Sequence, residues 1–136
     1  MMIKICGITR AEDAILAVEE GASMIGFVFA ESPRRISPGR AVDILAELEH
    51  RSLRAKVRVA GVFVNEEPSV IEEIHSIGAI DVAQIHGDET AAFCNALHVP
   101  WYRGLRVNER FISDEFRETV HALSCAEILV DAKVDG

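Results

Sequence analysis

A thiol, an imidazole, a carboxylic acid and several guanidinium groups recur at one kind of position in this sequence, the end of a short apolar run. The first three can transfer protons, and guanidinium groups hold anions. In parallel α/β folds the carboxyl ends of all strands open onto one face, so residues distant in sequence converge there. The sequence therefore predicts a proton-transfer site with anion-holding groups. Its candidate residues are Cys6, Arg34, Arg35, Asn65, Gln84, His86, Arg103, Arg106 and Asp131.

The apolar runs that would position these residues are short and rich in β-branched and aromatic side chains, as buried strands are. Longer segments of helical period separate them, a pattern typical of βαβ units around a parallel sheet. We expect strands at residues 2–6, 24–29, 57–64, 80–86, 101–107 and 127–131.

The segments between the runs each carry one apolar face with the i, i+3, i+4, i+7 spacing of a helix. Gly21 and Gly78 are placed to end helices, and Ser37 followed by Pro38 is placed to begin one. Asp88 is placed to cap the fourth helix, and Ser113 or Asp114 is placed to open the fifth.

Length and charge limit the fold and the partners. The chain has 136 residues, and at roughly 150 residues per domain this predicts one domain over residues 1–136. Its 14 Lys and Arg against 22 Asp and Glu give a net charge of −8, which disfavours nucleic acid and membrane partners. No apolar run approaches the roughly 20 residues of a membrane span.

The cysteines predict a reducing compartment. Cys6, Cys94 and Cys125 are odd in number and form no CxxC pair, which fits neither a disulfide framework nor a four-ligand zinc site. We therefore expect a cytoplasmic protein without a metal. Cys94 lies on an apolar helix face and is expected in the core, and Cys125 has no assigned role.

Five segments, in order, carry a resemblance to a known family. They are KICGIT at Lys4–Thr9, GFVF at Gly26–Phe29 running into SPRRIS at Ser32–Ser37, GVFVN at Gly61–Asn65, QIHG at Gln84–Gly87, and LVD at Leu129–Asp131. Together they resemble the phosphoribosylanthranilate isomerases of tryptophan biosynthesis. The resemblance runs along the whole chain.

The resemblance implies a parallel (β/α)8 TIM barrel, of which this chain holds the first six βα units. It also implies an Amadori rearrangement of N-(5′-phosphoribosyl)anthranilate to 1-(2-carboxyphenylamino)-1-deoxyribulose 5-phosphate, without a metal or organic cofactor. The family's acid corresponds to Asp131 and its base to Cys6. We match the family's carboxylate-holding arginine to Arg35 rather than Arg34. We expect His86 to line the site, with Arg106 as a further substrate-binding candidate.

The family's phosphate-gripping loops follow its seventh and eighth strands, which have no counterpart in these residues. Three hypotheses follow. The chain is part of an isomerase whose remaining units lie on a second chain or segment, or it belongs to another barrel family of the same pathway or of thiamin synthesis. That second reading needs a lysine-glutamate pair or a metal-diphosphate site. In the third, the chain is a non-catalytic open α/β sheet that serves as a binding or assembly partner through unpaired strand edges.

Overall fold

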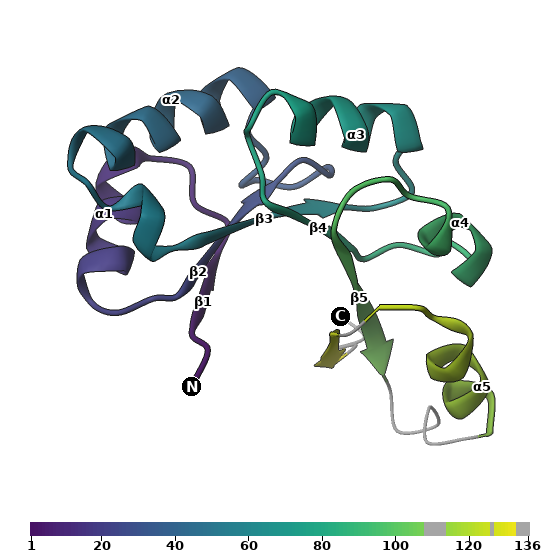
Figure 1. Ribbon diagram of the computed structural model, residues 1–136. Helices are drawn as coiled ribbons and strands as arrows, with labels where there is room; N and C mark the ends of the chain where they lie inside the picture. Colours follow the sequence, from purple (N-terminus) through teal and green to yellow (C-terminus); the bar gives the residue numbers. More distant parts are fainter. Residues whose placement is uncertain (108–113, 126, 133–136) are drawn as a thin grey trace.

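The computed structural model describes residues 1–107, 114–125 and 127–132. In this part of the chain, six parallel strands pair in sequence order to form one curled sheet (Figure 1). The strands are β1 (Lys4–Cys6), β2 (Met24–Val28), β3 (Arg58–Phe63), β4 (Val82–Ile85), β5 (Trp101–Val107) and β6 (Ile128–Ala132). The predicted parallel sheet is confirmed.

Helices alternate with the strands and arc over the convex side of the sheet, as the outer layer of a partial barrel (Figure 1). They are α1 (Ala11–Glu19), α2 (Pro38–His50), α3 (Pro68–Ser76), α4 (Ala91–Asn95) and α5 (Asp114–Ala122), with a short 3-10 turn at Arg54–Lys56. Among the described residues, no helix has the length and apolar character needed to cross a membrane.

The predicted helix ends are confirmed where a capping side chain or a glycine determines them. The Ser37 side chain accepts the Arg40 N–H at 3.1 Å, with Pro38 as the first residue of α2. Gly21 and Gly78 follow α1 and α3 with φ of 96° and 78°, a conformation that glycine adopts without the Cβ penalty. The predicted run 101–107 coincides with β5, and each of the other five runs overlaps a strand to within one or two residues at each end.

The prediction that Asp88 caps the fourth helix is wrong. Thr90 caps α4, because its side chain accepts the Phe93 N–H at 3.1 Å. The backbone N–H of Asp88 instead donates to the Asn65 side chain at 2.8 Å. Asp88 therefore belongs to the loop before α4. The fifth helix begins at Asp114, and Ser113 lies outside the described residues.

The two faces of the sheet have different contents. The convex face packs against the helices through a large apolar core that includes Phe27, Phe63 and Ile85. Cys94 is fully buried in this core, as expected from its helix face. The concave face holds a smaller apolar cluster of Met24, Ala60, Val82 and Tyr102. The concave face therefore has room for polar side chains.

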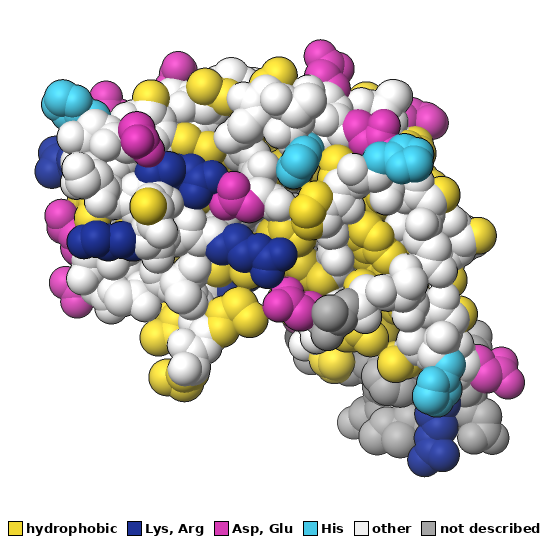
Figure 2. Space-filling model, in the orientation of Figure 1, with side chains coloured by type: hydrophobic (Ala, Val, Ile, Leu, Met, Phe, Trp, Pro, Cys, Tyr) yellow, Lys and Arg dark blue, Asp and Glu magenta, His cyan; other side chains and the backbone are white. Residues whose placement is uncertain are grey.

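The two outer strands leave apolar side chains uncovered. Within the described sheet, β1 pairs with β2 alone and β6 with β5 alone. Ile5 in β1 is 42% exposed and Val130 in β6 is 58% exposed. Figure 2 shows hydrophobic side chains around the notch between the N-terminal segment and the lobe that carries α5. A hollow of about 240 Å³ lies between Met2 and Leu129 near these edges.

Candidate active site

Strand register places the predicted acid and base on the concave face. In the parallel sheet Cys6 lies beside Gly26, and Arg106 lies beside Asp131. Side chains two residues apart share a face of a strand, so His86 lies on the same face as Gln84. Cys6 ends β1 and Asp131 lies near the end of β6. The acid and the base therefore occupy the carboxyl ends of the two outer strands.

His86 and Asp131 contact each other across β5. The His86 Nε2 atom lies 3.4 Å from an Asp131 carboxylate oxygen. The His86 side chain is 12% exposed and the Asp131 side chain is 55% exposed. Burial lowers the pKa of His86, and the positive charges of Arg106 and Arg103 lower it further, against an opposing effect of Asp131. His86 is therefore neutral at neutral pH, and Asp131 is open to a substrate.

Two glycines make room for these side chains. A Cβ added to Gly104 of β5 would overlap the His86 Nδ1 atom. A Cβ added to Gly26 of β2 would lie 2.8 Å from the Cys6 sulfur. Contacts this short force one side to move. Gly104 and Gly26 therefore fix where the imidazole and the thiol can lie.

A polar cluster occupies the concave face below the site. The Lys4 ammonium donates to the Gln84 side-chain oxygen and, at 2.9 Å, to the Tyr102 hydroxyl. Burial lowers the pKa of Lys4, while its contact with the Cys6 side chain opposes this effect. Burial also raises the pKa of Tyr102, which keeps this hydroxyl protonated. The lysine thus lies beside both the predicted base and the amide of Gln84.

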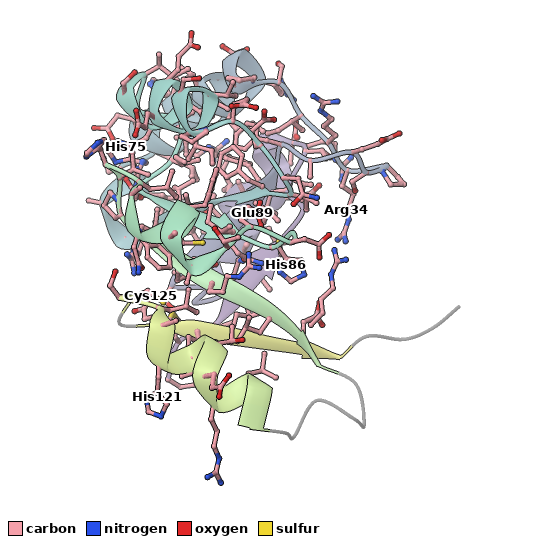
Figure 3. The ribbon with its side chains drawn as sticks, turned by 90° about the vertical axis from the view of Figure 1, so that its right-hand side faces the viewer. Arg34, His75, His86, Glu89, His121 and Cys125 are labelled. Atoms are coloured by element: carbon pink, nitrogen blue, oxygen red, sulfur yellow. The ribbon has the colours of Figure 1, made fainter. Side chains whose placement is uncertain are left out.

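The structure brings Arg34, rather than Arg35, to the predicted base. The Arg34 guanidinium donates to the backbone oxygen of Cys6 at 3.2 Å. A Cβ at Gly7 would lie 2.7 Å from that guanidinium. The missing side chain of Gly7 therefore lets the guanidinium approach the loop after β1. Arg35 instead lines a separate hollow with Phe29 and Glu66. Figure 3 shows Arg34 on the same side of the molecule as His86, while His75 and Cys125 lie on the other side.

A buried ion pair that the sequence did not reveal braces the loop after β4. The Arg103 guanidinium contacts the Glu89 carboxylate at 2.9 Å, with side chains that are 9% and 3% exposed. Arg103 also donates to the Gly87 backbone oxygen at 2.7 Å, and Glu89 accepts the Asn65 N–H at 2.6 Å. Arg103, a candidate anion-holding group, is instead engaged in this ion pair within the structure. Asn65 is likewise a loop brace.

Comparison with known proteins identifies the family. The family model for N-(5′-phosphoribosyl)anthranilate (PRA) isomerase matches residues 3–136. The chain belongs to this isomerase family. It is 39% identical over 98% of its length to an N-(5′-phosphoribosyl)anthranilate isomerase of Nitrosomonas europaea, and 47% identical over 76% of its length to one of Stutzerimonas stutzeri.

Solved isomerase structures share the fold. The chain aligns over 98% of its length with the phosphoribosyl anthranilate isomerase of Thermotoga maritima, at a TM-score of 0.83 and 36% identity. A further isomerase structure, a complex with reduced 1-(o-carboxyphenylamino)-1-deoxyribulose 5-phosphate, aligns with a TM-score of 0.83 and 34% identity. These neighbours confirm the barrel-type fold class.

The chain spans about three fifths of the length of the relatives it matches. It covers 61% of the Nitrosomonas europaea protein and 62% of the Thermotoga maritima chain. The aligned part of the isomerase family includes every predicted site residue of this chain, because the match runs through residue 136.

We predict that Gly104→Ala displaces the His86 imidazole. The new methyl group would overlap the ring, and overpacking of this kind costs about 1–3 kcal/mol. The NMR signals of His86 should shift and the melting temperature should fall. Gly39→Ala is the matched control, since Gly39 is a helical residue with no atom within 4 Å of an added Cβ. Equal effects of the two substitutions would show that Gly104 makes no special room for His86.

Proposed function

We propose that the chain supplies the acid-base half of an isomerase that converts N-(5′-phosphoribosyl)anthranilate to 1-(2-carboxyphenylamino)-1-deoxyribulose 5-phosphate. The observation that carries the proposal is the placement of Cys6 and the Asp131–His86 pair at the strand ends of one concave face, in a chain of this isomerase family. The pathway would be tryptophan biosynthesis, and we place the protein in the cytoplasm.

The reaction needs two proton transfers, and the site has a group for each. Asp131 protonates the ribose ring oxygen, and the ring opens to a Schiff base. Cys6 then removes the C2 proton, giving an enolamine that tautomerises to the ketone. Because these residues belong to β1 and β6, a substrate lying across the concave face would meet the base from one side and the acid from the other.

Arginines beside the site would hold the substrate's carboxylate. A guanidinium binds a carboxylate through two parallel hydrogen bonds. Arg34 contacts the Cys6 backbone, so it replaces Arg35 as our proposed ligand of the anthranilate group. Arg106 lies beside Asp131 in the register and close enough to influence His86, and we propose that it binds the substrate as well.

We further propose that two additional βα units close the sheet, either on a longer form of this chain or on a second polypeptide. The uncovered Ile5 and Val130 on the outer strands support this proposal, as does the greater length of the matched relatives. In parallel barrels, loops after the last two strands often bind phosphate, so these units would hold the phosphate end of the substrate.

A second candidate function is a non-catalytic assembly partner. The exposed apolar side chains on β1 and β6 favour it, because unpaired strand edges recruit other strands. The two functions differ in the requirement for Cys6 and Asp131. An assembly partner would keep its binding when both are replaced, whereas the isomerase would lose turnover.

The first test is completion of the sheet. The 136-residue chain alone should associate into oligomers and show negligible isomerase activity, because its outer strands are unpaired. Addition of a polypeptide that carries the last two βα units of a relative should restore both solubility and turnover, followed by the fluorescence of phosphoribosylanthranilate. A monodisperse, cooperatively melting monomer without activity would favour the assembly partner. Full activity of the monomer alone would contradict the need for further units.

The second test concerns the acid and the base. In the completed protein, Cys6→Ala and Asp131→Asn should each lower kcat by about 10²- to 10⁴-fold, the usual effect of removing a proton-transfer group. Melting temperatures should change little, because both side chains are exposed at the strand ends. Cys125→Ala and Asp43→Asn are the matched controls. Retention of more than about half the turnover would remove that residue from the mechanism.

The third test separates the neighbouring arginines. Arg34→Lys should raise KM more than it lowers kcat, because a lysine cannot make the paired hydrogen bonds of a guanidinium. Arg35→Lys should leave both parameters nearly unchanged. Steady-state kinetics of the two variants measure this difference. If the effects are exchanged, the carboxylate ligand is Arg35, as the sequence first indicated.

A further inference from the structure

The orientation of the Gln84 amide is fixed by its neighbours. Gln84 is 4% exposed. Its side-chain oxygen accepts from the Lys4 ammonium and, at 2.7 Å, from the Tyr102 hydroxyl. A lysine ammonium has donors and no acceptor, so the atom of the amide that faces it must be the oxygen. The amide nitrogen of Gln84 is thereby turned toward His86.

This orientation determines which His86 nitrogen carries the proton. The Gln84 Nε2 atom lies 3.2 Å from His86 Nδ1. An amide nitrogen only donates, so Nδ1 must be the accepting nitrogen, and the proton of the neutral ring must sit on Nε2. That second nitrogen is the one that lies 3.4 Å from the Asp131 carboxylate. A bulkier residue than Gly104 would exclude the ring from this position.

We propose that Gln84 is a positioning residue, which holds His86 in the Nε2–H tautomer and so directs a hydrogen bond at the carboxyl group of Asp131. Lys4 and Tyr102 set the direction of this chain of hydrogen bonds, and Asp131 is its end. The consequence for catalysis rests on the proposed function. The assignment of the tautomer rests only on the contacts of Gln84 and His86.

A neutral donor suits an acid better than a charged one. An imidazolium would place a full positive charge beside Asp131 and favour its ionised form. A neutral imidazole N–H can orient the carboxyl group without placing a full positive charge beside it. The charged groups that act on His86 are Arg106, Arg103 and Asp131, with Lys4 beyond Gln84. Both arginines oppose protonation of the ring. The amide of Gln84 opposes it too, because a protonated Nδ1 would point a hydrogen at the hydrogens of the amide.

The test is Gln84→Glu, which keeps the shape of the side chain. One carboxylate oxygen can still accept from Lys4 and Tyr102, but the other can only accept from His86. The substitution should therefore move the ring proton to Nδ1 or give an imidazolium, and raise the pH at which His86 titrates. Nitrogen-15 NMR of the labelled chain, alone or with an unlabelled completing polypeptide, reports both changes. His50, His75, His98 and His121 serve as internal controls.

Two outcomes would overturn the proposal. One is an Nδ1–H tautomer of His86 in the unsubstituted chain, which needs no variant to fold. The other is a Gln84→Glu chain in which the tautomer and the titration of His86 are unchanged.

A kinetic measurement on the completed protein separates this proposal from the proposed function. Gln84→Glu should lower kcat by at least about tenfold, in the same direction as the roughly 10⁴-fold loss that a wrong histidine tautomer causes in the Ser-His-Asp triad. KM should change little, and the pH profile of kcat should shift to higher pH. If the completed protein has no isomerase activity, the proposed function fails while the NMR result still decides the tautomer. An unshifted pH profile with full kcat would contradict a positioning role.

Discussion

The site depends on how little room the concave face of a curled parallel sheet leaves for side chains. Side chains there converge, so a large group fits only where a neighbouring strand offers a glycine. Gly26 leaves that space for Cys6, and Gly104 leaves it for His86. Polar groups placed in so confined a region also need partners. Among the described residues, every buried polar side-chain atom has one. On the concave face these partners form a series of side-chain contacts that runs from Lys4 through Gln84 and His86 to Asp131.

The opposite face of the sheet supports this arrangement. Alternation along β5 sends Tyr102 and Arg106 to the concave side and Arg103 to the convex side, beneath the loop that leads to α4. There Arg103 and Glu89 form a buried pair that holds the Gly87 backbone. Loss of one partner would leave a buried charge without compensation, which is strongly destabilising. The brace therefore links the stability of the fold to the position of His86.

Much of the architecture could be predicted from the sequence, because it follows local rules. The apolar runs predicted the strands. Ser37 and Pro38 predicted the start of α2, and Gly21 and Gly78 predicted the ends of two helices. The family resemblance then assigned Cys6 and Asp131. The cap of α4 was missed because the tertiary contact with Asn65 holds Asp88 in a loop, and no local pattern reveals that contact.

Other features that the sequence did not reveal also concern contacts between distant residues. Arg34 and Arg35 are adjacent and chemically identical, so the path of the loop alone decides which one reaches Cys6. Glu89 pairs with a residue 14 positions later and carries no motif. The position of Arg103 could have been inferred, since it alternates with Tyr102 and Gly104 along one strand. The tautomer of His86 depends on contacts among β1, β4, β5 and β6, which only the folded sheet brings together.

We propose that this chain forms an isomerase half-site on a sheet that further strands complete at β1 and β6. Amide hydrogen exchange of the chain, with and without a polypeptide carrying two more βα units, tests it most directly. At dilutions where the chain alone is monomeric, we expect β3 and β4 to be its most protected strands and the outer amides of β1 and β6 to exchange rapidly. Protection of both outer strands should rise together when the polypeptide is added. Full protection of β1 and β6 in a monomeric chain, or protection that rises at one edge alone, would show that two further βα units do not close the sheet between these strands.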